Sequence, residues 1–248
     1  YSSDYTNCWF FWTRIKWKEK NYCMKNILLT GDSRGLGEQI KQKLIDSGYN
    51  VIGLSRSGDD IKYDLSDVEG IKYLYLNTIK DRGPIHGYVN NAAFAYDDII
   101  TNLNSEKLME MYKVNVFSPM MLTKYVIRDM MLNKTKGSIV HISSISVHTG
   151  YKGLAMYAST KGSLEAFSKN TSREWGRIGI RSNIVCPGFM DTNMSSSLND
   201  EQRYKIFKRN SKQKELTTFE VSSTVKFLIS EDSSGITGQT IHVDNGTI

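Results

Sequence analysis

The residues best suited to chemistry in this chain are Tyr157 and Lys161, four positions apart in a segment expected to be helical. On a helix this spacing puts both side chains on one face, about one turn apart. An ammonium group beside a phenol favours the phenolate, so we expect the pKa of Tyr157 to lie below its ordinary value of about 10. Such a phenol can act as a general acid toward a carbonyl oxygen.

A serine hydroxyl that could bind the same oxygen precedes this helix. Residues 139–142 form an apolar run that predicts a buried strand ending at Ser143 and Ser144. Ser144 lies thirteen residues before Tyr157. A Tyr-x-x-x-Lys spacing also occurs on solvated helix faces, so its interpretation depends on the elements that would position it.

A glycine-rich turn lies between the first strand pattern, residues 26–30, and a helix expected to extend to about Ser47. Its sequence is Gly31-Asp32-Ser33-Arg34-Gly35-Leu36-Gly37. Glycines permit a tight turn and let a pyrophosphate approach the helix N-terminus, whose N–H groups and dipole favour an anion. The turn therefore predicts a dinucleotide site.

The second strand pattern, residues 50–54, indicates which dinucleotide. It is followed by Arg56, where an acidic residue would bond the ribose 2′-hydroxyl of NAD and an arginine would accommodate the 2′-phosphate of NADP. Arg34 could add a second positive charge, so we predict NADP, the alternative being that Arg56 is merely exposed. Asp64, at the end of a short third strand over residues 61–63, could accept a hydrogen bond from an adenine amino group.

The connection between these two strands is unusually short. Parallel neighbouring strands need a crossover of about a dozen or more residues, and only a few are present here. Either the usual connecting helix is cut down or absent, or the two strands are not neighbours in the sheet.

The rest of the chain alternates between helix and strand patterns. Helices are expected near residues 67–80, 105–132, 157–175 and 219–229, and further strands near residues 87–90, 180–186 and 239–243. The alternation predicts one α/β domain over residues 24–248, a single doubly wound parallel sheet of Rossmann type with a shortened crossover between strands two and three.

Several positions in this pattern need special partners. Pro119 predicts a kink or break in the helix over residues 105–132. Asn115, in the same apolar helix, needs a partner, so it is either a structural tie or part of the site.

The small residues after residue 90 suit a ligand lying across the sheet edge. Residues 193–215 are polar and lysine-rich, and either a mobile lid or a surface helix fits them.

Composition excludes several classes of function. Lys and Arg number 32 against 26 Asp and Glu, and this net charge of +6 is scattered, which argues against a nucleic-acid partner. No apolar run reaches the roughly 20 residues of a membrane span. The three cysteines form no C-x-x-C and the four histidines show no ligand spacing, so we predict no metal site and a reducing, cytoplasmic location.

Residues 1–23 differ in pattern from the rest of the chain, because aromatic residues alternate there with basic ones. They are either an amphipathic segment that contacts a membrane surface or a partner, or non-native sequence ahead of a start at Met24. We favour the second interpretation, a poorly structured extension, because the fold pattern begins immediately after Met24.

Taken together, these motifs resemble the short-chain dehydrogenase/reductase family over about residues 24–248. The matching residues are Thr30 to Gly37, Asn90-Asn91-Ala92-Ala93, Asn115, Ser144, Tyr157-x-x-x-Lys161 and Pro187-Gly188…Thr192. The segments 185–194 and 236–246 resemble those of 3-oxoacyl-[acyl-carrier-protein] reductases in particular. Two departures are the short segment between strands two and three, and Ala93 in place of the usual glycine of Asn-Asn-Ala-Gly.

The resemblance implies roles for individual residues. Tyr157 would donate the proton, Lys161 would lower its pKa and hold the nicotinamide ribose, and Ser144 would position the carbonyl. Asn115 would hold a water in a proton relay toward Lys161. The implied cofactor contacts are Gly31, Asp32, Ser33, Arg34, Gly35, Leu36, Gly37, Arg56, Asp64, Leu65, Asn91, Ala92, Tyr157, Lys161, Pro187, Gly188, Met190 and Thr192.

The resemblance also implies an activity and an assembly. The expected enzyme is an NADP-dependent oxidoreductase that reduces a ketone to a secondary alcohol. The substrate that the resemblance implies is a 3-oxoacyl thioester on an acyl carrier protein. Subunits would pair as homodimers or homotetramers through the helices at 105–132 and 157–175. The alternatives are a reductase of a sugar or other small ketone, and a non-catalytic NADPH-binding protein, which the complete Ser-Tyr-Lys set disfavours.

Overall fold

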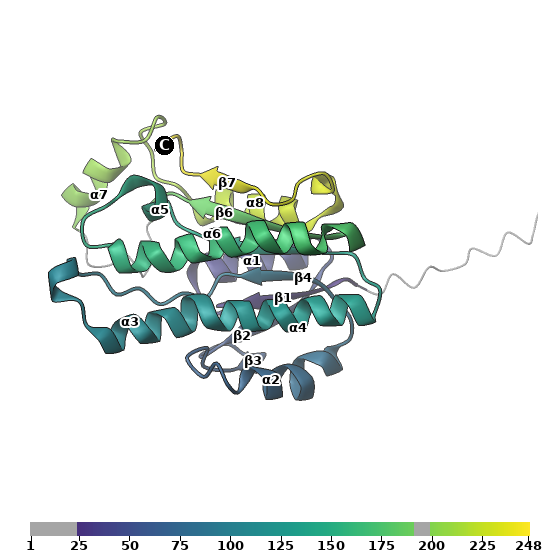
Figure 1. Cartoon of the computed structure of the whole chain (residues 1–248). Helices are drawn as coiled ribbons and strands as arrows, with labels where there is room; N and C mark the ends of the chain where they lie inside the picture. Colours follow the sequence, from purple (N-terminus) through teal and green to yellow (C-terminus); the bar gives the residue numbers. More distant parts are fainter. Residues whose placement is uncertain (1–23, 191–198) are drawn as a thin grey trace, which may run out of the picture.

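The structure of the protein is a computed structural model that describes residues 24–190 and 199–248. The interpretation of residues 1–23 and the predicted contact at Thr192 lie outside the described residues. Seven strands form one parallel sheet in the order β3-β2-β1-β4-β5-β6-β7 (Figure 1). The strands are β1 (Asn26–Thr30), β2 (Asn50–Ser55), β3 (Ile61–Lys62), β4 (Ile85–Asn90), β5 (Gly137–Ile142), β6 (Ile180–Pro187) and β7 (Thr240–Val243).

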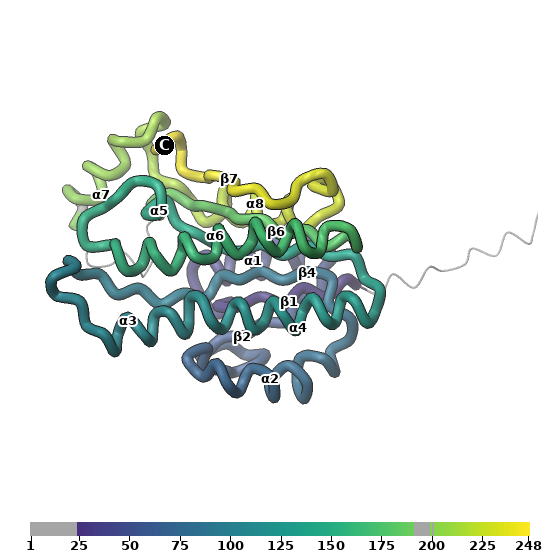
Figure 2. Tube along the Cα trace, in the orientation of Figure 1, coloured from purple at the N-terminus to yellow at the C-terminus, as the bar shows by residue number. Residues whose placement is uncertain are grey.

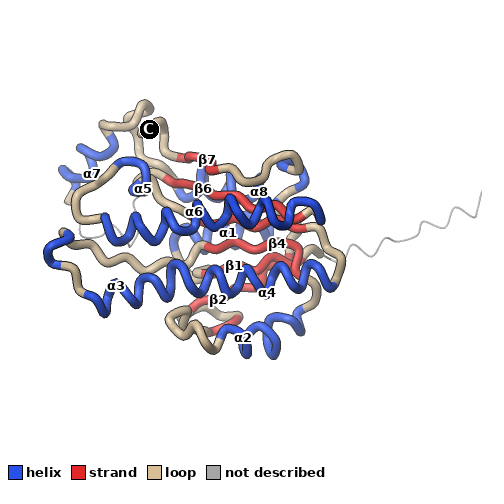
Figure 3. The backbone as a smooth tube through the Cα atoms, in the orientation of Figure 1, coloured by secondary structure: helices blue, strands red, loops and turns tan. Residues whose placement is uncertain are grey.

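Helices cover both faces of the sheet (Figure 3). The α-helices are α1 (Gly35–Asp46), α2 (Ile71–Leu74), α3 (Ser105–Tyr112), α4 (Ser118–Leu132), α5 (Ser146–Thr149), α6 (Ala155–Trp175), α7 (Asp200–Phe207) and α8 (Thr218–Ile229). Helices α4 and α6 lie on the near face in Figure 1, and α1 and α8 lie on the far face. The predicted doubly wound α/β fold is confirmed.

The first strand shows why the sheet needs two covering layers. All five residues of β1 are buried, although a strand with one solvated face would alternate. Leu28 joins the apolar core beneath α2 and α4, while Ile27 and Leu29 join the core beneath α1 and α8. The side chains of β1 alternate between the two faces of the sheet, and helices shield both faces from solvent. No helix in the described residues is long and apolar enough to cross a membrane.

The short connection joins two true neighbours. Leu54 of β2 pairs in parallel with Ile61 of β3, and residues 56–60 link the strands without a helix. Asp60 fastens this loop, because its carboxylate accepts from the Gly53 N–H at 3.0 Å and pairs with Arg82 at 2.8 Å. The first of the two alternatives is therefore correct: strands two and three are neighbours in the sheet, and the usual connecting helix is absent.

The expected helix over residues 105–132 is interrupted before its proline. Helix α3 passes through a π-helical turn, Lys113–Phe117, into α4, where Pro119 is the second residue. The predicted break is therefore present as this turn, and Pro119 sits where a helix tolerates a missing N–H. Residues 91–104, which follow β4, and residues 143–154, which follow β5, lie at the same end of the molecule (Figure 2).

Candidate active site

The carboxyl end of β5 is held by two side chains of α6. Lys161, which is 2% exposed, donates from Nζ to the carbonyl oxygen of Ile142 at 2.8 Å. One turn further along, Glu165 accepts a hydrogen bond from the Ser143 hydroxyl. Residues 157, 161 and 165 share one helix face, so these anchors bring Tyr157 to the end of the sheet where Ser144 lies.

Burial governs the ionisation of the Tyr157 and Lys161 pair. The Lys161 ammonium lies 5.6 Å from the centre of the Tyr157 ring. Burial raises the pKa of the Tyr157 phenol above its ordinary value, and the nearby Asp97 carboxylate adds to this rise. Burial also lowers the pKa of Lys161 to about 8. The expected lowering of the Tyr157 pKa is therefore wrong for the protein alone, because the loss of water around the phenolate outweighs an ammonium directed at a carbonyl.

The hydroxyl groups of Tyr157 and Ser144 remain available to a ligand. Tyr157 donates its hydroxyl to none of the residues that the structure describes, and its side chain is only partly buried. Ser144 accepts from the Ser146 N–H at 3.2 Å and from the Ser146 hydroxyl at 3.0 Å. Because Ser144 accepts both bonds, its own O–H can donate to a substrate oxygen.

Asn115 is a structural tie. Its side-chain oxygen accepts from the Phe94 N–H at 2.8 Å, and its amide group donates to the Phe94 carbonyl at 2.8 Å and to Thr160 at 3.1 Å. The side chain joins the loop after β4 to helix α6, next to Lys161. The π-helical turn that holds Asn115 is a rare geometry often found at functional sites, and the role of Asn115 in a proton relay stays a prediction.

The glycine turn has the close approaches that a phosphate cradle requires. A Cβ at Gly37 would lie 1.8 Å from the Gly31 carbonyl oxygen, and one at Gly31 would lie 2.9 Å from the Cα of Ala92. Gly35 has a φ of +56° and open space beside it. The N-cap residue of α1, Arg34, makes no side-chain hydrogen bond to the first turn, so that turn offers its N–H groups outward. These features fit a bound pyrophosphate.

The side chain of Asp32 is buried and binds other residues of the protein. Its carboxylate, 1% exposed, pairs with Lys41 at 2.8 Å and accepts from the Ser55 hydroxyl at 2.8 Å. A Cβ at Gly53 would lie 2.1 Å from this carboxylate, so the glycine in β2 makes room for it. Only the backbone atoms of Asp32 would therefore be able to contact a cofactor.

The predicted adenine-side residues surround the short loop. Arg34 and Arg56 are both exposed, and Ser33 lies 3.2 Å from Ser57 between their hydroxyl oxygens. The Ser66 N–H, which donates to Asp64 at 2.9 Å, lowers the pKa of that carboxyl, and Arg56 contributes to the same effect. Arg56 and Asp64 are thus brought within electrostatic reach of each other. Leu65 is buried, and its carbonyl accepts from the hydroxyl of Ser118 in α4.

The ends of β4 and β6 complete the sheet edge. The Asn91 amide donates to the carbonyls of Thr30 and Gly31 at 3.2 and 3.0 Å, which fixes the glycine turn against the end of β4. The Pro187 carbonyl accepts from Ile145 N–H at 3.0 Å, and Gly188 donates to Val243 at 2.8 Å. Met190 is partly buried against the core beneath α1 and α8.

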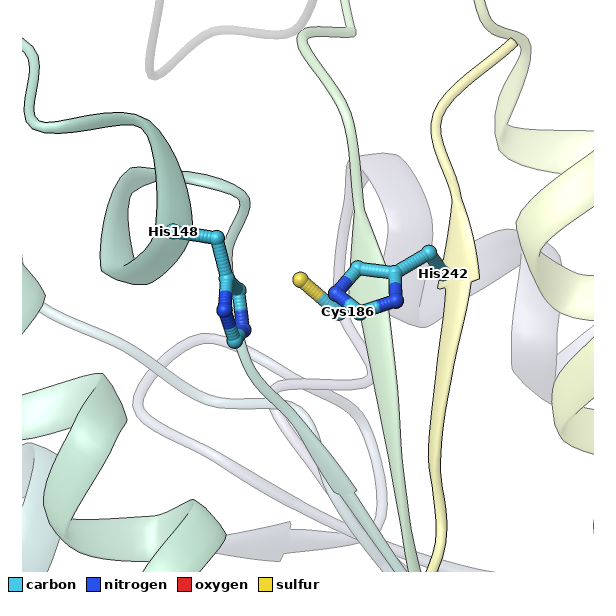
Figure 4. A group of neighbouring side chains, drawn as sticks. All are labelled: His148, Cys186 and His242. Atoms are coloured by element: carbon cyan, nitrogen blue, oxygen red, sulfur yellow. The ribbon is translucent and has the colours of Figure 1, made fainter. Parts of the chain in front are cut away.

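The structure also brings together three side chains that the linear sequence did not pair. His148 of α5, Cys186 of β6 and His242 of β7 point toward one another (Figure 4). Sequence spacing could not reveal this group, because its members lie on three elements that are distant in the chain and adjacent only in the fold.

Comparisons with known proteins agree with this geometry. A family model described as Enoyl-(Acyl carrier protein) reductase matches residues 31–247. The 3-oxoacyl-[acyl-carrier-protein] reductase FabG of Salmonella typhimurium (strain LT2) is 33% identical over 236 residues, which cover 90% of this chain and 96% of the relative. FabG of Escherichia coli (strain K12) is 32% identical over 240 residues, or 91% of this chain and 98% of the relative.

A solved structure described as ElxO with NADP bound shares the fold. It superposes with a TM-score of 0.83 at 26% sequence identity, and the match covers 90% of this chain and 98% of the other. The likeness therefore extends over nearly the whole of both chains.

Proposed function

Because the chain belongs to the short-chain dehydrogenase/reductase family, an NAD(P)-dependent oxidoreductase family, we propose that it reduces a 3-oxoacyl thioester to the 3-hydroxyacyl thioester with NADPH. The observation that carries the proposal is the arrangement at the end of β5. Lys161 is anchored on the Ile142 carbonyl, and Tyr157, one turn away on the same helix face, has a hydroxyl that donates to none of the described residues.

The glycine turn and the sheet edge would hold the cofactor. Gly31, Gly35 and Gly37 leave the space that a pyrophosphate needs at the uncapped start of α1. Asn91 keeps that turn in place against β4. When bound, reduced nicotinamide supplies the hydride, and the protein supplies position and a proton donor.

The chain's own residues then act on the carbonyl oxygen. The Ser144 hydroxyl donates a hydrogen bond to it, since its acceptor lone pairs are occupied by Ser146. Tyr157 donates its proton to the same oxygen. The raised pKa of Tyr157 keeps the phenol protonated at neutral pH, the form that reduction requires. The nearby Lys161 ammonium stabilises the phenolate that remains.

The proposed preference for NADPH is supported by the two exposed arginines. Arg34 is the N-cap residue of α1, and Arg56 is the first residue after β2, where a 2′-phosphate would lie. An ionic hydrogen bond to a phosphate contributes roughly 1.5–3 kcal/mol. We therefore expect Arg56→Ala to weaken NADPH binding about 10- to 100-fold and to leave NADH binding unchanged.

The proposed substrate class is supported by the two bacterial relatives, which are 3-oxoacyl-[acyl-carrier-protein] reductases and match nearly the full chain. The test is NADPH oxidation by the protein with an acetoacetyl thioester, run beside NADH and with the variants Tyr157→Phe and Arg56→Ala. We expect turnover with NADPH, a loss of about 10²- to 10⁴-fold in Tyr157→Phe with NADPH binding intact, and a preference for NADPH over NADH that is about 10- to 100-fold smaller in Arg56→Ala.

The outcomes separate the parts of the proposal. Full activity in Tyr157→Phe would remove Tyr157 as the acid. Binding of NADPH without turnover on the thioester would redirect the search to sugars and other small ketones. Failure to bind either nucleotide would contradict the assignment of the glycine turn.

A further inference from the structure

Three side chains with metal-binding chemistry converge beside the proposed active site. One ligand atom from each of His148, Cys186 and His242 lies within 4.8 Å of the other two. The three side chains point toward one another (Figure 4). Cys186 is buried and both histidines are exposed, so the group is open to solvent on one side. The residues come from α5, β6 and β7, elements that are adjacent only in the folded chain.

The group has a carboxylate partner of the kind that orients ligating histidines. Nε2 of His148 lies 3.2 Å from Oε1 of Glu165. Glu165 is itself held by the Ser143 hydroxyl. The rings of His148 and His242 meet edge to face with their centres 4.8 Å apart. A carboxylate on a ligating imidazole fixes the ring and increases its basicity.

We propose that His148, Cys186 and His242 form a binding site for a zinc-class divalent ion, with a solvent molecule as the fourth ligand. Two imidazoles and a thiolate suit Zn²⁺, which prefers nitrogen and sulfur ligands in a tetrahedron. The Cys186 thiol would release its proton to solvent as the ion binds. Tetrahedral zinc would hold these atoms roughly 3.5 Å apart, so the ligands must close by about 1 Å. The exposed ring of His242 can rotate to do so, around a sulfur fixed in the core and a His148 ring held by Glu165.

The ion would act on the structure near Ser144 and would take no part in the reaction. Helix α5 has only four residues and begins two positions after Ser144. A helix of this length has little stability of its own. An ion shared by α5, β6 and β7 would tie this turn to two strands of the sheet. This inference therefore stands apart from the reduction proposed above.

The test is metal binding to the full chain with Cys8→Ser and Cys23→Ser, so that Cys186 is its one thiol. Co²⁺ and Zn²⁺ are titrated into metal-free protein and followed by Co²⁺ absorption and by the metal content after dialysis. We expect one ion per chain, a thiolate-to-cobalt charge-transfer band and a rise in Tm. The matched comparison is His242→Gln, in the cluster, against His86→Gln, outside it.

The proposal predicts a different loss of metal affinity for each variant. Both Cys186→Ser and His242→Gln should weaken binding more than about 100-fold, Glu165→Gln about 10- to 100-fold, and His86→Gln less than twofold. Because His242 is exposed, its variant should fold even if the buried Cys186 variant does not. Absence of saturable binding, absence of the thiolate band, or unchanged binding in His242→Gln would each overturn the proposal.

Discussion

The two ends of the candidate site position their groups by different means. At the glycine turn, close contacts between backbone atoms set the shape, and the N-terminus of α1 makes no side-chain cap. At the end of β5, long side chains of α6 reach across to the strand and hold it by hydrogen bonds. The first arrangement leaves N–H groups for an anion, whereas the second leaves hydroxyl groups for a carbonyl.

Other helix starts in the same molecule sharpen this contrast. Helices α7 and α8 both begin with a capping box, in which the N-cap side chain and a Gln or Glu three residues later satisfy backbone N–H groups. Helix α1 lacks such a cap although Ser33 is one residue away from its N-cap position. Helix α6, which carries Tyr157 and Lys161, also begins without a side-chain cap, so both long helices at the candidate site leave the N–H groups of their first turn uncapped.

The largest effect is expected from Gly37→Ala. Its new Cβ would fall 1.8 Å from the Gly31 carbonyl oxygen, and backbone atoms cannot yield as a flexible side chain can. We expect dinucleotide affinity, measured by calorimetry, to fall more than about 100-fold. Gly176→Ala, which would place its Cβ in open space, is the control and should bind normally. Equal binding by both variants would refute a backbone-shaped cradle.

The catalytic end should respond to pH. Lys161 is charged below a pKa of about 8 and neutral above it, while Tyr157 keeps its proton across this range. We therefore expect kcat/KM for ketone reduction to be level below about pH 8 and to fall as pH rises through it, by up to tenfold per unit. Stopped-flow measurement at saturating NADPH would show this, and a profile level to pH 10 would exclude Lys161 as the group that titrates.

A moderate loss of stability is expected from Asp32→Asn. The change removes the pairing with Lys41 and leaves a buried amide beside Ser55. Removal of one partner of a buried pair costs about 3–5 kcal/mol, and the partial exposure of Lys41 reduces the expected loss to about 1–3 kcal/mol. Urea unfolding measures this loss. An unchanged midpoint would mean that the Asp32 carboxylate contributes nothing to the stability of the fold.

The smallest effect is expected at the capping box of α8. The Thr217 N–H and the Lys214 ammonium, which both bind Glu220, lower the pKa of its carboxyl to about 2. A lowered pKa stabilises the fold above about pH 4.5, and this contribution is lost as pH falls toward 2. Glu220→Gln should therefore lower the free energy of unfolding by about 1 kcal/mol at pH 7 and by much less near pH 2. Equal losses at both pH values would contradict this.

Local patterns predicted most of the fold. The first strand matches its prediction at both ends, and the last helix and last strand each begin within one residue of theirs. Both signals are local, since they come from apolar periodicity and from turn residues. The pattern also predicted that strands two and three have a short connection, but only the structure shows that Asp60 and Arg82 fasten it.

Partners distant in the sequence explain what could not be predicted. The spacing of Tyr157 and Lys161 indicated a lowered tyrosine pKa, but burial by surrounding elements reversed the direction. The resemblance implied a cofactor contact for Asp32, yet Gly53 makes room for its carboxylate inside the protein. His148 and His242 come together only through the order of β5, β6 and β7. No sequence pattern within a single turn or strand indicates any of these effects.

The five-residue link between β2 and β3 also bears on how the sheet forms. Leu54 and Ile61 pair although they are only seven positions apart, whereas Asn26 and Asn50 of β1 and β2 are 24 apart. Loop-closure entropy grows by about 0.6 kcal/mol for each doubling of length, so the first pairing opposes folding by about 1 kcal/mol less. Contacts close in sequence form fastest. We expect this edge of the sheet to be a place where parallel pairing can begin before the long crossovers close.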